Sequence, residues 1–173
     1  MAVEKTLSSQ SIFKGSLVGL RVDQVGLSNG KTTSREIVNH RPSVTIVPLT
    51  ETREVLLVSQ FRYPVKGFLL ETPAGKIEDK ESPEECAQRE LQEEVGQLAG
   101  RLLKLGDFWT TPGFCDQLMH VFLAEELQPS ILTPDDDEDI TVVPVSVANI
   151  PGMIAEGMIR DAKTIAALLM ADL

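Results

Sequence analysis

The sequence contains only two cysteines, Cys86 and Cys115, among its 173 residues. Two thiols are too few for the disulfide framework of a small secreted domain, so we expect a cytoplasmic protein stabilised by apolar packing. Long apolar runs are also missing, because no segment approaches the roughly 20 apolar residues that a membrane-spanning helix needs. The first eleven residues lack the apolar core of a signal peptide. These absences predict a compact protein with no membrane partner.

Positive charge is scarce relative to negative charge. Lysine and arginine number 16 against 26 aspartates and glutamates, which gives a formal net charge of -10. Nucleic acids and anionic membranes attract basic surfaces, so this balance argues against both as partners. A small phosphate ester is still compatible with the charge, because divalent cations can bridge carboxylates and phosphates.

The N-terminal part of the chain has the pattern of a β-hairpin. Strands are expected at residues 17–27 and 32–38, and the Asn-Gly pair between them is a strong signal for a two-residue turn. The alternation of apolar residues slips between Val22 and Val25. This slip predicts a bulge or a break inside the first strand.

The remainder of the chain has the pattern of a mixed α/β domain. Strands are expected at residues 43–49, 54–60, 68–71, 102–109, 118–124 and 140–147. The first two of these should pair across the polar turn between them. A helix over residues 162–170, capped by Asp161, should follow a short helix near Met153. Strands, a helix, more strands and a helix predict a mixed sheet covered by helices on both faces.

The clearest helix is predicted at residues 83–95. Ser82 can cap it, Pro83 suits the first helical position, and Glu85 completes a capping box. Gly96 is expected to end the helix in the left-handed conformation. Apolar residues four apart form the face that should point inward.

Three glutamates gather on this helix. Glu90 and Glu94 share a face because residues four apart differ by about 40° around the axis, and Glu93 lies beside them. Such carboxylates repel each other, but oxygen ligands next to a glycine turn at Gly75 suit Mg²⁺ or Mn²⁺. The cation would cancel the repulsion and bridge to phosphate oxygens. A solvated surface helix, in which Arg89 pairs with Glu85 or Glu93, explains the helix alone equally well.

The spacing of the whole segment distinguishes these two interpretations. From Gly75 to Gly96 the chain is GKIEDKESPEECAQRELQEEVG. This segment resembles the Nudix box, G-x5-E-x7-R-E-U-x-E-E-x-G-U, where U is a bulky aliphatic residue. The matching residues are Gly75, Glu81, Arg89, Glu90, Leu91, Glu93, Glu94 and Gly96, and only Gln97 departs from the pattern.

The resemblance implies a Nudix fold, an α/β/α sandwich with a mixed sheet plus an N-terminal β-hairpin segment. Residues 1–40 would form that segment and contribute to a dimer contact, and residues 41–173 would form the catalytic domain. A strand, a loop and a helix in such a domain bind a divalent metal. The activity implied is hydrolysis of a nucleoside diphosphate linked to another group.

Further motifs resemble the ADP-ribose pyrophosphatase subgroup of this family. Pro112 lies fifteen residues beyond Gln97, and the other matching segments are Arg35-Glu36, Gln60-Phe-Arg62, Glu71-Thr-Pro-Ala-Gly75 and residues 135–142. The subgroup implies cleavage of ADP-ribose to AMP and ribose 5-phosphate, by a homodimer that exchanges N-terminal segments. Gln117 follows Asp116 where the subgroup often has an acidic residue, so metal count or sugar preference could differ.

The resemblance also implies roles for individual residues. The metal ligands would be the Ala74 carbonyl, Glu90, Glu93 and Glu94. Substrate would be bound by Arg35, Glu36, Arg62, Thr111 and Gly113. Glu71 and Glu81 would support the ligands, and the catalytic residues would be Arg89, Glu93 and Glu138. The general base stays open between Glu93 and Glu138.

Three functions stay open at this point. The first is an ADP-ribose or ADP-sugar pyrophosphatase, and the second is a Nudix enzyme for another substrate, such as a damaged nucleotide or a GDP-sugar. The third is a catalytically silent nucleotide sensor, which would be expected to have lost box carboxylates that this chain keeps. A P-loop at residues 30–32 is excluded, because Val25 stands where its first glycine belongs. His40 and His120 are expected to have structural or surface roles.

Overall fold

The computed structural model describes residues 3–133 and 139–173. The chain divides into two compact units. The first unit holds residues 3–42 and 109–118, and the second holds the remaining described residues. The division after Pro42 lies two residues beyond the expected boundary, and the segment 109–118 belongs with the N-terminal unit although it is distant in sequence.

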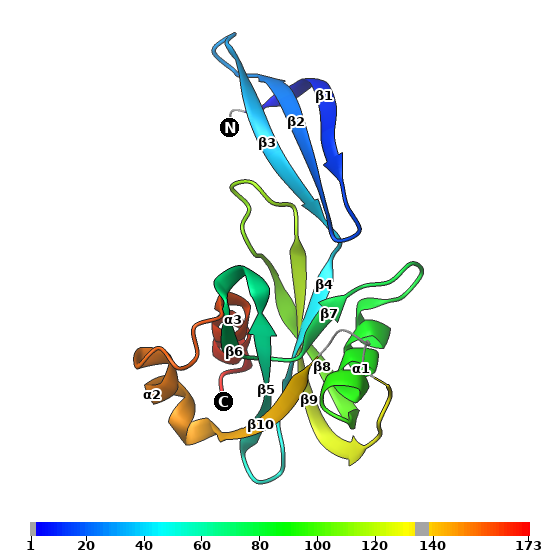
Figure 1. The fold of residues 1–173 in the computed structure, drawn as a ribbon, viewed down its shortest axis with the longest axis vertical. Helices are drawn as coiled ribbons and strands as arrows, with labels where there is room; N and C mark the ends of the chain where they lie inside the picture. The colour runs from blue at the N-terminus through cyan, green and yellow to red at the C-terminus, as the bar shows by residue number, and fades with distance from the viewer. Residues whose placement is uncertain (1–2, 134–138) are drawn as a thin grey trace. The chain divides into compact units, whose positions relative to one another are not determined.

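The first unit is a three-stranded antiparallel sheet (Figure 1). Its strands are β1 (Lys5–Lys14), β2 (Val18–Gly26) and β3 (Thr32–His40). The predicted hairpin is present as β2 and β3, and β1 extends it by a strand that the sequence did not predict. Every residue of β1 is exposed, so it lacks the alternation of buried and exposed positions that predicts a strand.

The predicted break between Val22 and Val25 is wrong. β2 pairs with β3 in one register along its whole length. The irregularities lie instead in β1, where the register with β2 shifts around Leu7 and around Ile12. Because a bulge adds an unpaired residue to one strand only, the apolar residues of β1 fall out of a period of two.

The segment 109–118 is tied to the end of β3 by backbone and side-chain hydrogen bonds. The Val38 N–H donates to the Phe114 carbonyl at 2.7 Å, and the Asp116 N–H donates to the Val38 carbonyl at 3.2 Å. The Asp116 carboxylate accepts a hydrogen bond from the His40 N–H at 2.8 Å. These contacts explain why this turn belongs to the N-terminal unit.

The second unit contains two sheets. The four-stranded sheet has the order β7 (Ala74–Lys76), β4 (Ser43–Pro48), β9 (Leu118–Pro129) and β8 (Gln97–Trp109). It is mixed, because β4 runs parallel to β9 and antiparallel to β7. The antiparallel three-stranded sheet has the order β10 (Ile140–Ser146), β5 (Glu54–Arg62) and β6 (Gly67–Glu71). The expected pairing of β4 with β5 is therefore wrong: they lie in different sheets, and only a bridge from Leu49 to Val55 joins them.

Helices cover both sides of β4. Val44 and Ile46 pack into the core under α1 (Pro83–Glu94), whereas Val47 packs into the core that contains α3 (Ala162–Ala171). Figure 1 shows α1 in green and α3 in red on opposite sides of β4. This arrangement confirms the predicted α/β/α sandwich with a mixed sheet. The remaining helices are α2 (Ile150–Ala155) and the 3₁₀ turns η1 (Tyr63–Val65) and η2 (Val147–Asn149).

Local chemistry sets the ends of α1 as predicted. The Ser82 hydroxyl accepts from the Glu85 N–H at 3.2 Å, and the Glu85 carboxylate accepts from the Ser82 N–H at 2.8 Å. Gly96 has a φ of +70°, so it stops the helix in the left-handed conformation. Asp161 likewise caps α3 through the Thr164 N–H at 3.0 Å. Within the described ranges, no helix is long and apolar enough to cross a membrane.

Candidate active site

The segment from β7 to α1 brings two buried glutamates against the edge of the four-stranded sheet. β7 pairs with β4 through Ala74 and Thr45, and Leu91 of α1 packs fully buried against this sheet. This packing orients Glu90 and Glu94 toward β7, where they are only 8% and 7% exposed. Carboxylates that are buried to this extent need polar partners or a cation.

The Glu90 carboxylate occupies the space that a side chain at position 75 would fill. A Cβ added to Gly75 would lie 1.7 Å from Glu90 Oε1 and 1.9 Å from its carboxyl carbon. Gly75 lies in the extended strand β7 and has no positive φ. The sequence argument that Gly75 is needed for a turn is therefore wrong. A residue without a Cβ is needed at position 75 because the Glu90 carboxylate lies against the backbone there.

Glu94 is held by the same strand. Its carboxylate accepts a hydrogen bond from the Ala74 N–H at 3.3 Å. Ala74 thus touches the predicted ligand set through its N–H, and the role of its carbonyl as a metal ligand stays a prediction. Glu93 is more exposed than its two neighbours and projects beside them toward Arg89.

Arg89 connects three of the predicted carboxylates. Its Nε donates to Glu81 Oε1 at 2.8 Å, and its Nη1 donates to Glu90 at 2.7 Å and to Glu93 at 2.8 Å. The expected alternative pairing with Glu85 is absent, since Glu85 caps the helix instead. The hydrogen bonds from Arg89 hold the pKa of Glu81 below its usual range, and Glu81 raises the pKa of Arg89 in return.

The donor atoms gathered here suit a hard divalent cation. They are carboxylate and backbone oxygens, which Mg²⁺ and Mn²⁺ prefer. Among residues 3–133 and 139–173, no three acidic, histidine or cysteine side chains already converge on one point. Arg89 instead donates a hydrogen bond to one carboxylate oxygen of Glu90 and to one of Glu93. Because Gly75 has no Cβ, the Glu90 carboxylate has a defined position against β7, which also binds Glu94, so the chemistry of the set fits the metal.

A second charged cluster lies near Glu94. Arg62, at the end of β5, donates to both oxygens of Glu71 at 2.8 and 2.7 Å, and Lys163 of α3 contacts the same carboxylate. Burial raises the pKa of Glu71, but the hydrogen bonds and charges of Arg62 and Lys163 outweigh it and leave the pKa below the usual value. The Glu71 hydrogen bonds raise the pKa of Arg62, and the charges of Glu94 and Asp161 add to this effect.

The other predicted substrate residues lie in the first unit. Arg35 donates to Glu4 at 3.0 Å, and Glu36 is its neighbour on β3, so the two side chains point to opposite faces of the sheet. The Thr111 carbonyl accepts two backbone hydrogen bonds that close the turn in which Gly113 is exposed. Their contact with substrate stays a prediction.

The remaining predictions concern the departures from the family pattern and the second candidate base. Gln97 begins β8 and is half-buried. Gln117 accepts a hydrogen bond from the Thr110 hydroxyl at 3.1 Å, so it helps to close the turn 109–118. Glu138 lies outside the described residues.

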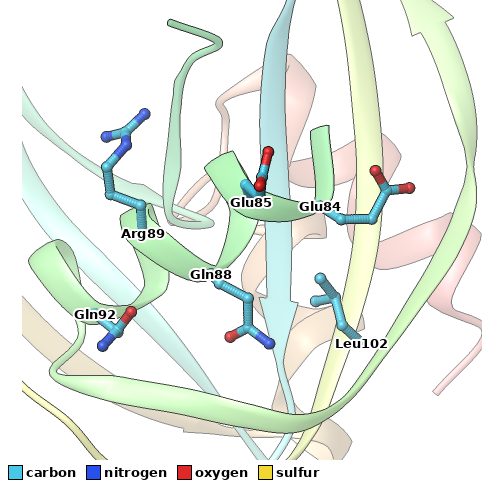
Figure 2. Close-up of a pocket in the computed structure, with 6 residues that line it drawn as sticks. All are labelled: Glu84, Glu85, Gln88, Arg89, Gln92 and Leu102. Atoms are coloured by element: carbon cyan, nitrogen blue, oxygen red, sulfur yellow. The ribbon is translucent and has the colours of Figure 1, made fainter. Parts of the chain in front are cut away.

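An open groove of about 470 Å³ follows the outer side of α1. It is lined by Glu84, Glu85, Gln88, Arg89, Gln92 and Leu102. Figure 2 shows the Arg89 guanidinium pointing away from Leu102. Gln88 bonds the Ala99 backbone through both ends of its amide, at 2.9 and 3.0 Å, which fixes β8 against α1. Since the groove contains neither Glu90 nor Glu94, it is not the candidate active site.

Comparison with known proteins identifies the family. A model of the NUDIX domain matches residues 39–168, which include the whole strand–loop–helix described above. The chain belongs to the Nudix family. The ADP-ribose pyrophosphatase of Bacillus subtilis (strain 168) is 42% identical over 165 residues, which cover 93% of this chain and 88% of that protein.

Two further matches extend over nearly the whole chain. The methanol dehydrogenase activator of Bacillus methanolicus is 36% identical, with 95% of this chain and 90% of that protein covered. A solved structure described as an ADP compounds hydrolase superposes with a TM-score of 0.88 at 25% identity, and it covers 98% of this chain and 92% of that one. The predicted Nudix fold is thereby confirmed, and the chain is a Nudix hydrolase.

Sequence reasoning missed the part that α3 has in the charged cluster. The sequence predicts Asp161 only as a helix cap and indicates no role for Lys163. One local signal was available: a lysine in the first turn of a helix is unfavourably placed in the field of the helix dipole. Such local conflicts are expected at functional sites.

Proposed function

We propose that this Nudix hydrolase cleaves the pyrophosphate bond of ADP-ribose to give AMP and ribose 5-phosphate. One observation carries the proposal: Ala74 binds the buried carboxylate of Glu94 at 3.3 Å, and Glu71, three residues earlier, binds Arg62 with two hydrogen bonds at 2.8 and 2.7 Å. One short segment thus holds a carboxylate that could bind a metal and a guanidinium that could bind a phosphate. The names of the Bacillus subtilis relative and of the matching structure support an ADP-linked substrate.

Mg²⁺ is the proposed cofactor, and Mn²⁺ has the same ligand preference. The Ala74 carbonyl, Glu90, Glu93 and Glu94 would hold it. A bound divalent cation lowers the pKa of a coordinated water and neutralises charge on phosphate oxygens. The chain itself orients the ligands: Glu81 anchors Arg89, and Arg89 fixes one oxygen of each neighbouring carboxylate.

The remaining steps use groups of the chain. Arg62 would bind a phosphate, because a planar guanidinium matches phosphate oxygens with paired hydrogen bonds. A water oxygen forms a bond to phosphorus, a bridging P–O bond breaks, and a carboxylate takes the proton that the water loses. We propose Glu138 as this base, with Glu93 as the other candidate. Glu71 keeps Arg62 in place through two hydrogen bonds.

We also propose that the enzyme works as a cytoplasmic homodimer. Leu7, Ile12 and Phe13 of β1 are each more than half exposed, which leaves an apolar surface that a second copy could cover. In such a dimer Arg35 and Glu36 would help to line the partner's site. Both cysteines are free, which agrees with a reducing compartment.

A substrate panel tests the proposal. Wild-type protein is assayed with ADP-ribose, ADP-glucose, GDP-mannose and 8-oxo-dGTP in Mg²⁺ and in Mn²⁺, and the nucleoside monophosphate products are separated and quantified by anion-exchange chromatography. ADP-ribose should give the highest kcat/KM, and Glu94→Gln prepared in parallel should exclude a contaminating enzyme. A clear preference for GDP-mannose or 8-oxo-dGTP over both ADP-linked compounds would overturn the proposal.

A further inference from the structure

The first turn of α3 holds the loop that leads into the metal site. Lys163 contacts the Glu71 carboxylate, and the Thr164 hydroxyl accepts a hydrogen bond from the Thr72 N–H at 2.9 Å. Two consecutive residues of the helix thus hold Glu71, the last residue of β6, and Thr72, the first residue of the loop that follows. Glu71, Thr72 and Thr164 are at most 2% exposed. Water cannot compete readily for these contacts, so they are stronger than the same contacts on the surface.

This helix turn is itself fixed on two sides. The Asp161 carboxylate accepts from the Thr164 N–H at 3.0 Å, from its hydroxyl at 2.6 Å and from Lys163 Nζ at 2.8 Å. On the other side, the Thr72 hydroxyl lies 2.7 Å from the hydroxyl of Thr45 on the central strand β4. The loop therefore lies between two rigid elements.

These contacts affect two groups of the candidate active site, Arg62 and Glu94. Glu71 binds Arg62 with two hydrogen bonds and so sets the direction of its guanidinium. Ala74 follows Thr72 by two residues, and its N–H binds the Glu94 carboxylate at 3.3 Å. A shift of the loop would displace both groups together. Misplacement of a reacting group by about 1 Å can lower a rate by about 10²-fold.

The position of Lys163 is unfavourable for a positively charged side chain, which suggests that the lysine has a specific role. The N-terminal end of a helix disfavours a positive charge, and the side chain is only 14% exposed. Its charge is compensated by Glu71 at the end of β6 and by Asp161, the N-cap residue of α3. Removing the lysine would release the Glu71 carboxylate from α3, and Arg62 would lose the fixed acceptor that now sets its direction.

We propose that Lys163 is a positioning residue of the active site, which acts through Glu71 on Arg62 and on the segment from Glu71 to Ala74. It touches neither substrate nor metal. The inference rests on the proposed function for the identity of the phosphate ester that Arg62 meets. The arrangement of Arg62 itself can be measured without any substrate.

The kinetic test compares Lys163→Met with Lys163→Arg and with the control Lys104→Met. Lys104 forms an ion pair with Asp107 at 3.0 Å on β8, so the control removes one paired lysine elsewhere in the same unit. Lys163→Met should raise the KM for ADP-ribose by about tenfold or more and lower kcat/KM by about 10²-fold. Lys163→Arg should restore most of the loss, and Lys104→Met should behave as wild type.

A double-mutant cycle separates positioning from general stability. Because Lys163 acts in part through Arg62, Lys163→Met should lower kcat/KM by a smaller factor in a protein that already carries Arg62→Met than in wild type. A merely structural lysine would lower the melting temperature and give additive losses in the cycle. Additive losses, or wild-type kinetics of Lys163→Met, would overturn the inference.

The measurement without substrate is the ¹H–¹⁵N signal of the Arg62 Nε–H group. The signal should be sharp and slow to exchange in wild type and in Lys104→Met, and it should be lost by exchange in Lys163→Met. If Lys163→Met does not fold, Lys163→Gln removes the charge but keeps a polar side chain beside the Glu71 carboxylate, and it should fold but still lose the signal. A protected signal in whichever variant folds would refute the inference. If wild type does not hydrolyse ADP-ribose while Arg62 still depends on Lys163, the proposed function fails and this inference stands.

Discussion

Replacing Gly75 with alanine should damage metal binding and leave the fold in place. The new methyl carbon would lie 1.7 Å from Glu90 Oε1, whereas ordinary contact begins at 3.4 Å. The carboxylate must therefore retreat by roughly 1.5 Å or more, and metal–ligand distances tolerate only about 0.2 Å. Since a misplacement of about 1 Å can lower a rate about 10²-fold, we expect a loss of that size in kcat/KM at limiting Mg²⁺.

The assay is ADP-ribose hydrolysis across a Mg²⁺ titration, with thermal unfolding measured in parallel. The half-saturating Mg²⁺ concentration should rise, and excess Mg²⁺ should recover part of the rate. Overpacking should destabilise the fold by about 1–3 kcal/mol, which a domain of this size tolerates. The control is Gly152→Ala, whose new Cβ meets nothing within 4 Å, and it should keep wild-type activity. Unchanged kcat/KM and unchanged half-saturating Mg²⁺ in Gly75→Ala would refute the argument that Glu90 binds metal from this position.

Four further predictions follow from the site and the fold. Glu94→Gln keeps the shape of the side chain and removes its charge, so turnover at limiting Mg²⁺ should collapse; wild-type turnover would contradict its role as a ligand. Glu138→Gln should lower kcat by about 10²-fold with little change in KM, whereas a crippled Glu93→Gln beside a nearly normal Glu138→Gln would place the base on α1. Light scattering should give a dimer of the 18.9 kDa chain, and a monomer mass would exclude shared sites. Because Arg89 holds the pKa of Glu81 below its ordinary value of 4.5, this glutamate stabilises the fold above that pH, and its contribution should disappear as the pH falls from there through its folded-state pKa. Urea unfolding of wild type and Glu81→Gln between pH 3 and 7 measures the difference, and parallel pH profiles would rule it out.

Elements with strong local signals could be predicted from the sequence. α1 begins and ends where Ser82, Glu85 and Gly96 place it, because caps and a left-handed glycine act within a few residues of the backbone that they satisfy. β1 has no such signal, since both of its faces are exposed and two bulges disturb its period. The pairing of β4 also could not be predicted, because its partners β7 and β9 are chosen by packing under α1 and not by the turn that follows β4.

The candidate site also has parts that local sequence signals predict and parts that depend on contacts between distant residues. Spacing within one segment places Glu90 and Glu94 on one face of a helix, and the structure brings both to β7. The reason for Gly75 could not be predicted, because it depends on the approach of a side chain from fifteen residues along the chain. Lys163 lies 92 residues from Glu71, and only the folded chain brings the two together.

Arg89 and a divalent cation would compete for the carboxylates of Glu90 and Glu93. Either one supplies the positive charge that lets Glu81, Glu90, Glu93 and Glu94 lie close together. Arg89 is tied to Glu81 by two hydrogen bonds at 2.8 and 3.1 Å, but to Glu90 and Glu93 by one each. A cation that draws on Glu90 and Glu93 would therefore leave the guanidinium anchored beside them. When no cation is bound, the same guanidinium supplies the positive charge that limits their repulsion. Positive charge would thus be available in both states, so a bound cation could leave the site without unfolding of the segment from β7 to α1.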